Sequence, residues 1–121
     1  MSEHERVVYD IWGALGLLGN GSFQYFFEND MDANAVAESF DRLGLPSVAA
    51  YFRAAKERFP KAIDKGNWNQ MLAFMQNHEG EFDSLAAQVL QQQNEIQASL
   101  AAYIRSRPQF FNEAMNQKDG K

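Results

Sequence analysis

The stretch NGSFQYFFEN, residues 20–29, places four aromatic side chains in five positions between two asparagines. Its first three residues are of types that form tight turns and cap helices. Phe23, Phe26 and Phe27 are spaced i, i+3 and i+4, so they share one face of a helix. Three phenylalanines on one helical face of a small domain are typical of a core. The sequence therefore predicts a turn at 20–22 that aims a short aromatic helix inward.

The residues before this stretch predict a first helix over about 3–18. Ser2 and Glu5 have the spacing of a capping box, in which each side chain accepts from the other residue's backbone N–H. Apolar residues then recur with helical spacing, and Gly19 is a typical left-handed stop. The predicted inward stripe is Val7, Val8, Ile11, Trp12, Leu15 and Leu18.

The residues after the stretch predict five further helices. Asp32 or Asn34 is expected to cap the first of these and Gly44 to end it, and Pro46 suits the first turn of the next. No stretch alternates with period two for long enough to form a strand. The sequence predicts an all-α fold of about seven helices, with residues 61–66 as a mobile loop. The five apolar stripes lie within Val36–Leu43, Val48–Phe59, Trp68–Met75, Phe82–Val89 and Ile96–Ile104.

Length and composition predict one compact domain. The chain has 121 residues, of which 45% are hydrophobic and 22% charged, which is ordinary globular usage. The absence of cysteine excludes disulfides and thiolate sites. No apolar run is long enough to cross a bilayer, and the polar, acidic start is unlike a signal peptide, so we expect a cytoplasmic protein. We assign residues 1–108 to a helical domain and 109–121 to a partly frayed tail, which Phe110 and Phe111 would anchor.

Charge is distributed unevenly along the chain. The formal net charge is -5, but residues 1–41 carry eight acids against one base, and residues 42–65 carry six bases against two acids. Two interpretations remain open: charge complementarity within the molecule, or an acidic face that attracts a basic partner. Arg53, Lys56 and Arg58 give one predicted helix a basic side. We nevertheless expect no direct nucleic-acid binding, because the neighbouring acids would repel phosphates.

The sequence shows no residue set that predicts catalysis or metal binding. His4 and His78 belong to no HExxH pattern and are interpreted as surface residues. Gly13 and Gly16 belong to a glycine-rich string that lacks the Lys-Ser/Thr ending of a phosphate loop, so they favour close helix packing. We therefore expect no enzyme activity and no catalytic, cofactor-binding or metal-binding site.

Several motifs resemble the DNA mimic protein 19-like family of bacteria. The family pattern near residues 20–29 runs Asn-Gly-Gly-Phe-x-x-Phe-Phe-x-Asn, and here Ser22 replaces the second glycine. The resemblance covers about residues 5–107. Its other parts are Val8–Trp12, Ala35–Leu45, Ala54–Ala55, Phe59–Pro60 and, more faintly, Leu100–Ile104.

The resemblance implies an all-helical, often dimeric domain. The family's founding member is a DNA mimic, whose surface carboxylates imitate phosphates and occupy the DNA-binding face of a transcription factor. Such binding would be salt-sensitive. We expect a non-enzymatic protein with a basic, DNA-binding protein partner; the alternative is a helical interaction or dimerisation module without mimicry. The candidate partner-binding acids beside the aromatic stretch are Glu28, Asp30, Asp32, Glu38 and Asp41, and a second acidic cluster is Glu79, Glu81 and Asp83.

Overall fold

A computed structural model of the chain describes residues 2–63 and 66–108. This part of the chain contains six helices and no strand, which confirms the all-α prediction. Residues 109–121, where a frayed and anchored tail was predicted, and residues 64–65 of the predicted mobile loop lie outside the described residues. The helices are α1 (Glu3–Glu28), α2 (Ala33–Arg42), α3 (Pro46–Glu57), α4 (Trp68–Asn77), α5 (Glu79–Gln91) and α6 (Gln93–Arg105).

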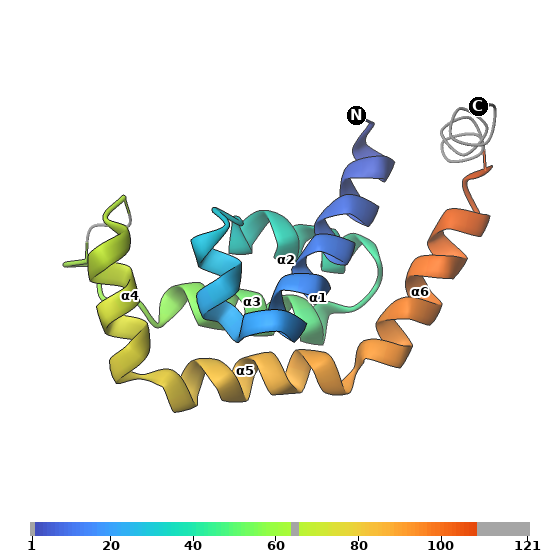
Figure 1. Cartoon of the computed structure of the whole chain (residues 1–121). Coiled ribbons are helices and arrows are strands. Elements are labelled where there is room, and N and C mark those ends of the chain that lie inside the picture. The colour runs from blue at the N-terminus through green and yellow to red at the C-terminus, as the bar shows by residue number, and fades with distance from the viewer. Residues whose placement is uncertain (1, 64–65, 109–121) are drawn as a thin grey trace, which may run out of the picture.

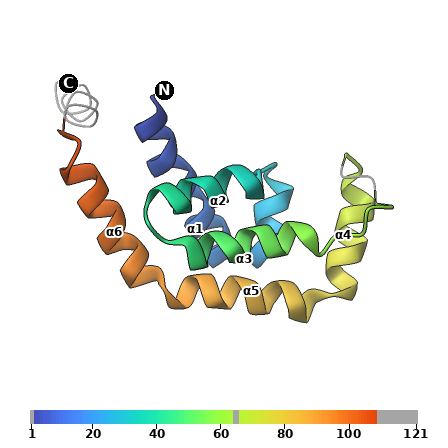
Figure 2. The same cartoon turned by 180° about the vertical axis from the view of Figure 1, so that it is seen from behind.

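Helices α4, α5 and α6 surround the first three helices on three sides (Figure 1 and Figure 2). Figure 1 shows α5 running along the base, with α4 and α6 rising from its two ends. The reverse view in Figure 2 shows α2 and α3 side by side above α5. Helix α1 contacts both α2 and α5, so it lies at the centre of the packing.

The prediction of about seven helices was wrong by one, because the first two predicted helices are a single kinked element. The helix predicted to stop at Gly19 continues through Asn20. The break lies at Gly21 (φ -163°, ψ 25°) and Ser22 (φ 60°, ψ -159°), after which the helix resumes to Glu28. Glycine is required at position 21, because a Cβ there would lie 2.8 Å from three side-chain atoms of Tyr25. The predicted turn at 20–22 is therefore a kink inside α1.

The predicted ends of α2 and the predicted start of α3 are confirmed, whereas α3 ends at Glu57, two residues before the end of the predicted stripe at Phe59. The Asp32 carboxylate accepts hydrogen bonds from the backbone N–H groups of Asn34 (3.0 Å) and Ala35 (3.3 Å), which caps α2. Gly44 has φ +86°, the left-handed conformation that glycine adopts without strain, directly after α2. Pro46 is the first residue of α3.

The core is centred on phenylalanine rings that three helices contribute. Phe23 and Phe26 of α1 are fully buried, as are Phe40 of α2 and Phe52 of α3. The Phe52 ring centroid lies 5.2–5.5 Å from those of the other three rings, within the usual range for aromatic pairs. Phe27 is half-buried and packs against this core, so the predicted inward face of the 20–29 stretch is confirmed.

Candidate functional site

The five acids predicted to bind a partner are all exposed and lie along one continuous segment. Glu28 ends α1, Asp30 lies in the turn after it, and Asp32 caps α2. Glu38 and Asp41 follow on α2. The structure therefore places all five on the α1–α2 junction and α2.

Two of these acids form ion pairs with α3. Asp41 Oδ2 lies 2.6 Å from Arg53 Nη2, and Asp32 Oδ1 lies 3.9 Å from Lys56 Nζ. The basic side of α3 therefore neutralises acids of α2, which favours charge complementarity within the molecule. Three more ion pairs among the described residues join Glu3 with Arg42, Asp10 with Arg6, and Glu81 with Arg58.

The other three candidate acids differ from Asp32 and Asp41 in their ion pairing. Glu28, Asp30 and Glu38 are exposed and form no ion pair with any residue in the described ranges. Asp30 also has φ 58°, so its backbone occupies the left-handed region that few side chains adopt.

The second acidic cluster lies at the start of α5. Glu79 and Glu81 are in the first turn of this helix, where negative charge suits the helix dipole. Glu81 Oε1 lies 3.2 Å from Arg58 Nη1. These interactions give Glu79 and Glu81 a structural role.

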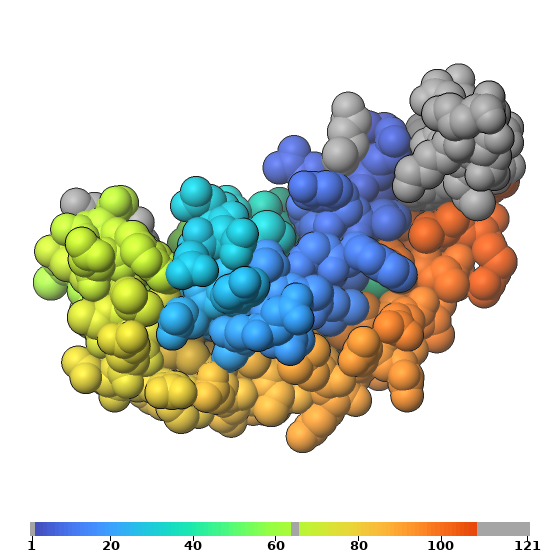
Figure 3. Space-filling model, viewed as in Figure 1, coloured from blue at the N-terminus to red at the C-terminus, as the bar shows by residue number. Residues whose placement is uncertain are grey.

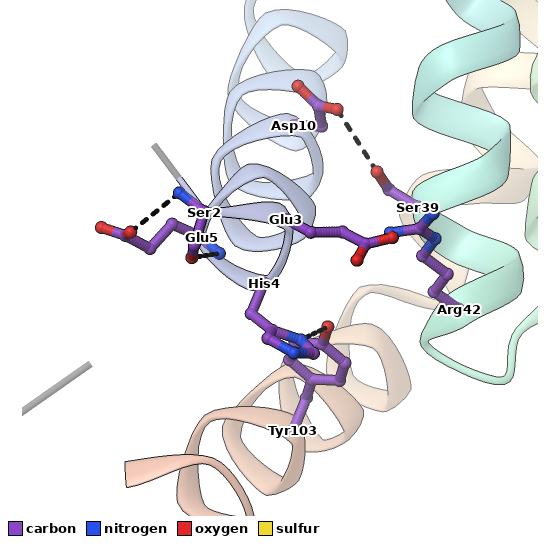
Figure 4. A network of polar contacts seen from close by, with 8 residues as sticks. All are labelled: Ser2, Glu3, His4, Glu5, Asp10, Ser39, Arg42 and Tyr103. Carbon is purple, nitrogen blue, oxygen red and sulfur yellow. Dashed lines mark hydrogen bonds and ion pairs between the residues drawn. The ribbon is translucent and has the colours of Figure 1, made fainter. Parts of the chain in front are cut away.

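Polar contacts tie the first turns of α1 to α2 and α6 (Figure 4). His4 Nδ1 lies 2.7 Å from the Tyr103 hydroxyl oxygen of α6. On the α2 side, the Ser39 hydroxyl donates to Asp10 Oδ2 over 3.3 Å, and both residues are buried. These contacts hold α1 between its two neighbours.

Both histidines, which were interpreted as surface residues, are half-buried, and each packs against a neighbouring ring. The His4 ring packs at 5.8 Å from the Tyr103 ring. The His78 ring stacks on Phe74 at 4.1 Å, and His78 Nδ1 lies 2.9 Å from the Phe74 carbonyl oxygen. The His4 ring thus joins α1 to α6, whereas the His78 ring packs on the last turn of α4.

The predicted capping box at the start of α1 is confirmed. The Ser2 backbone N–H donates to Glu5 Oε1 over 3.0 Å, and the Glu5 backbone N–H donates to Ser2 Oγ over 3.2 Å. The hydrogen bond from the Ser2 backbone lowers the pKa of the Glu5 carboxyl below its ordinary value of 4.5.

This cap predicts a pH-dependent contribution to stability. Because the folded pKa of Glu5 is lowered, its contribution is fully present above pH 4.5 and is lost as the pH falls through the folded pKa. Glu5→Gln keeps a capping side chain that does not titrate. We expect the stability difference between wild type and Glu5→Gln, measured by urea unfolding from pH 7 to pH 3, to shrink toward low pH. A pH-independent difference would contradict this role for the Glu5 carboxylate.

The structure places Trp12 outside the core, which corrects the predicted inward stripe. Trp12 is 65% exposed and Tyr9 is 63% exposed. The buried face of α1 instead runs through Val7, Ile11 and Leu18. Because each residue turns an α-helix by about 100°, Trp12 points away from the direction of its buried neighbour Ile11.

Tyr9 and Trp12 line an open groove of about 870 Å³ along α1. Figure 3 shows that much of α1, in blue, is uncovered on the viewed face of the molecule. The groove ends beside the α1–α2 junction, where the candidate acids begin. Its lining residues are Glu5, Val8, Tyr9, Trp12, Gly13, Gly16, Leu17, Asn20, Asn29 and Met31.

Sequence reasoning missed this groove, although its signal was present. Tyr9, Trp12, Gly13 and Gly16 are spaced i, i+3, i+4 and i+7, so they define a second face of α1 beside the buried one. The two glycines were predicted to pack closely against another helix. A Cβ at Gly16 would meet nothing within 4 Å, so no described helix packs there.

Metal-ligand clusters and membrane-spanning helices are both absent from the described residues. No group of three or more His, Asp or Glu side chains in residues 2–63 and 66–108 is arranged to hold a metal ion. Within the same ranges, no helix has both the length and the apolar character needed to cross a bilayer.

The fold and surface define a small, all-helical domain with exposed carboxylates beside an aromatic groove. A family model described as DMP19-like protein matches residues 1–107. The chain therefore belongs to the DMP19-like family, and the resemblance to the DNA mimic protein 19-like family is confirmed. No curated protein and no solved structure matches the chain.

Proposed function

We propose that this chain is a non-enzymatic, cytoplasmic binding protein that presents an acidic face to a basic, DNA-binding protein such as a transcription factor. Membership in the DMP19-like family is consistent with this function. The observation that carries it is the set of exposed carboxylates of Glu28, Asp30 and Glu38. They lie on one segment and have no ion-pair partner among the described residues.

The physical basis is competition for the same cations. A DNA-binding face carries Lys and Arg side chains that contact phosphates, and surface carboxylates can occupy those side chains instead. The attraction acts between solvated charges, so it weakens as salt shortens the Debye length from about 10 Å at 0.1 M to about 3 Å at 1 M. Asp32 and Asp41 contribute less, because Lys56 and Arg53 already offset their charges.

A second candidate function is a helical interaction or dimerisation module without DNA mimicry. The exposed Tyr9–Trp12 groove favours it, because large aromatic side chains in solvent are typical of protein interfaces. The two functions differ in what drives binding: charge in the first, and apolar burial in the second.

The test is capture of a DNA-binding partner at two salt concentrations, followed by competition with duplex DNA. We expect the wild-type protein to retain the partner at low salt and to release it at high salt or when duplex DNA is added. The triple variant Glu28→Gln, Asp30→Asn, Glu38→Gln is expected to weaken capture by about tenfold or more, since it removes three carboxylates from the proposed face.

The matched control is Glu57→Gln, Asp83→Asn, Glu95→Gln, which changes the net charge equally at exposed positions elsewhere. It should retain capture, because generic acidity is not the proposed cause. Equal weakening by both triple variants would contradict a localised acidic face. A captured partner that duplex DNA does not displace would exclude mimicry and favour the interaction module.

A further inference from the structure

The groove on α1 has an apolar floor and acidic residues around it. Among the described residues that line it, Glu5 is charged and no lysine or arginine is present. The Glu5 carboxylate stays ionised at neutral pH, because its hydrogen bond to the Ser2 backbone favours the charged form.

The adjoining hollow extends this acidic character. It shares Tyr9 and Met31 with the groove and is also lined by Asp30 and by Asp32, of which Asp32 is paired with Lys56. Arg6 lines this hollow as well, but its Nε lies 3.6 Å from Asp10 Oδ1, so its charge is already offset. A basic ligand that rests on the aromatic rings would therefore meet carboxylates at the side of the groove.

The shape of the groove suits a helix. It follows one face of α1, where Gly13 and Gly16 carry no side chain to hold a partner backbone away. Packed helices approach to about 8–10 Å between their axes, with the shorter distances at small residues. The exposed Tyr9 and Trp12 rings beside the glycines offer apolar contacts to side chains at i, i+3 and i+4 of such a helix.

We propose that this groove binds an amphipathic helix of a basic protein. The apolar side of the helix packs on Tyr9 and Trp12 over the Gly13–Gly16 face, and its lysine or arginine side chains meet Glu5 and Asp30. This inference rests on the proposed function, since it names the element that the basic partner contributes. The partner would then be held in two ways. Salt weakens the attraction between its cations and the acidic face, but salt does not weaken the apolar contact in the groove.

The probe is a displayed library of helical peptides of about 18 residues, long enough to form a helix on binding. Leucine is fixed at i, i+3, i+4 and i+7, and the flanking positions vary among lysine, glutamate and glutamine. Selection on the full-length protein should enrich lysine over glutamate at the flanking positions. The best peptides, labelled for fluorescence anisotropy, should bind Tyr9→Ala and Trp12→Ala about tenfold or more weakly.

Tyr25→Ala is the matched control for loss of an exposed aromatic ring. Tyr25 is 43% exposed on α1 and does not line the groove, so this variant should bind the selected peptides as the wild type does. Glu5→Gln together with Asp30→Asn should weaken binding of the lysine-rich peptides and leave their neutral glutamine versions unaffected.

Four outcomes would overturn the proposal. The first is that no selected peptide depends on Trp12, and the second is enrichment of glutamate or no charge preference. The third is a dimer in sedimentation that Trp12→Ala converts to monomer, which would assign the groove to a second copy of this chain. Capture that survives Trp12→Ala but fails in the Glu28, Asp30, Glu38 triple variant would leave the acidic-face function standing while this inference fails.

Discussion

Replacing Phe52 with alanine is expected to lower the free energy of unfolding by about 4 kcal/mol. Phe52 has no exposed surface, and its ring centroid lies within 5.5 Å of those of Phe23, Phe26 and Phe40. Removing the ring takes away apolar contacts with α1 and α2 together and leaves a cavity where three helices meet. A domain of ordinary stability has about 5–15 kcal/mol in total, so this single loss is large.

Urea unfolding followed by circular dichroism measures this loss directly. Phe52→Leu is the control, because leucine refills part of the volume, and we expect it to lower the free energy of unfolding by roughly 1–2 kcal/mol. If Phe52→Ala does not populate the folded state in the absence of urea, the smaller change still gives a measurable midpoint. Equal stabilities for wild type and Phe52→Leu would contradict a tightly packed ring cluster.

The sequence predicted the helices and most of their ends, because those features depend on local chemistry. The Ser2–Glu5 capping box, Asp32 as an N-cap and Gly44 after α2 involve residues at most four positions apart, and all three were confirmed. The burial of Phe23 followed from its spacing alone. Periodicity of this kind identifies an apolar face without knowledge of its partner helix.

Trp12 shows the limit of that reasoning. Val7, Ile11 and Trp12 fit one broad apolar stripe in the sequence, but only the first two are covered by other helices. Which part of a broad stripe is covered depends on where α2 and α5 lie, and no local pattern specifies that. The groove therefore includes a residue, Trp12, of a stripe that was predicted to face the core.

The ion pairs illustrate the same limit for the candidate acids. Asp41 was predicted to face a partner on the basis of local acidity, yet it lies 2.6 Å from Arg53, twelve residues away. Asp32 is similarly close to Lys56. Charge blocks along the sequence showed that acids and bases were segregated, but only the packing of α3 against α2 shows which of them meet.

Replacing Ser22 with glycine is expected to raise the free energy of unfolding by about 1–2 kcal/mol. Ser22 has φ 60° and ψ -159°, a region that is essentially restricted to glycine and costs other residues about 1–3 kcal/mol. Its hydroxyl oxygen is buried and has no hydrogen-bond partner within the described part of the chain. Glycine relieves both costs, and the extra freedom it gives the unfolded chain opposes the gain by about 0.5–1 kcal/mol.

Ser22→Ala separates the two causes, because it removes the hydroxyl and keeps the Cβ in its strained conformation. In urea unfolding, we expect the order of stability to be Ser22→Gly, then Ser22→Ala, then wild type. A Ser22→Gly protein no more stable than Ser22→Ala would show that the kink carries little backbone strain. The expected order has a structural meaning: the kink that aims Phe23 and Phe26 into the core forms here in spite of the serine. The packing of those two rings must then outweigh the local strain, which is why the aromatic stretch determines the fold more strongly than the turn that precedes it.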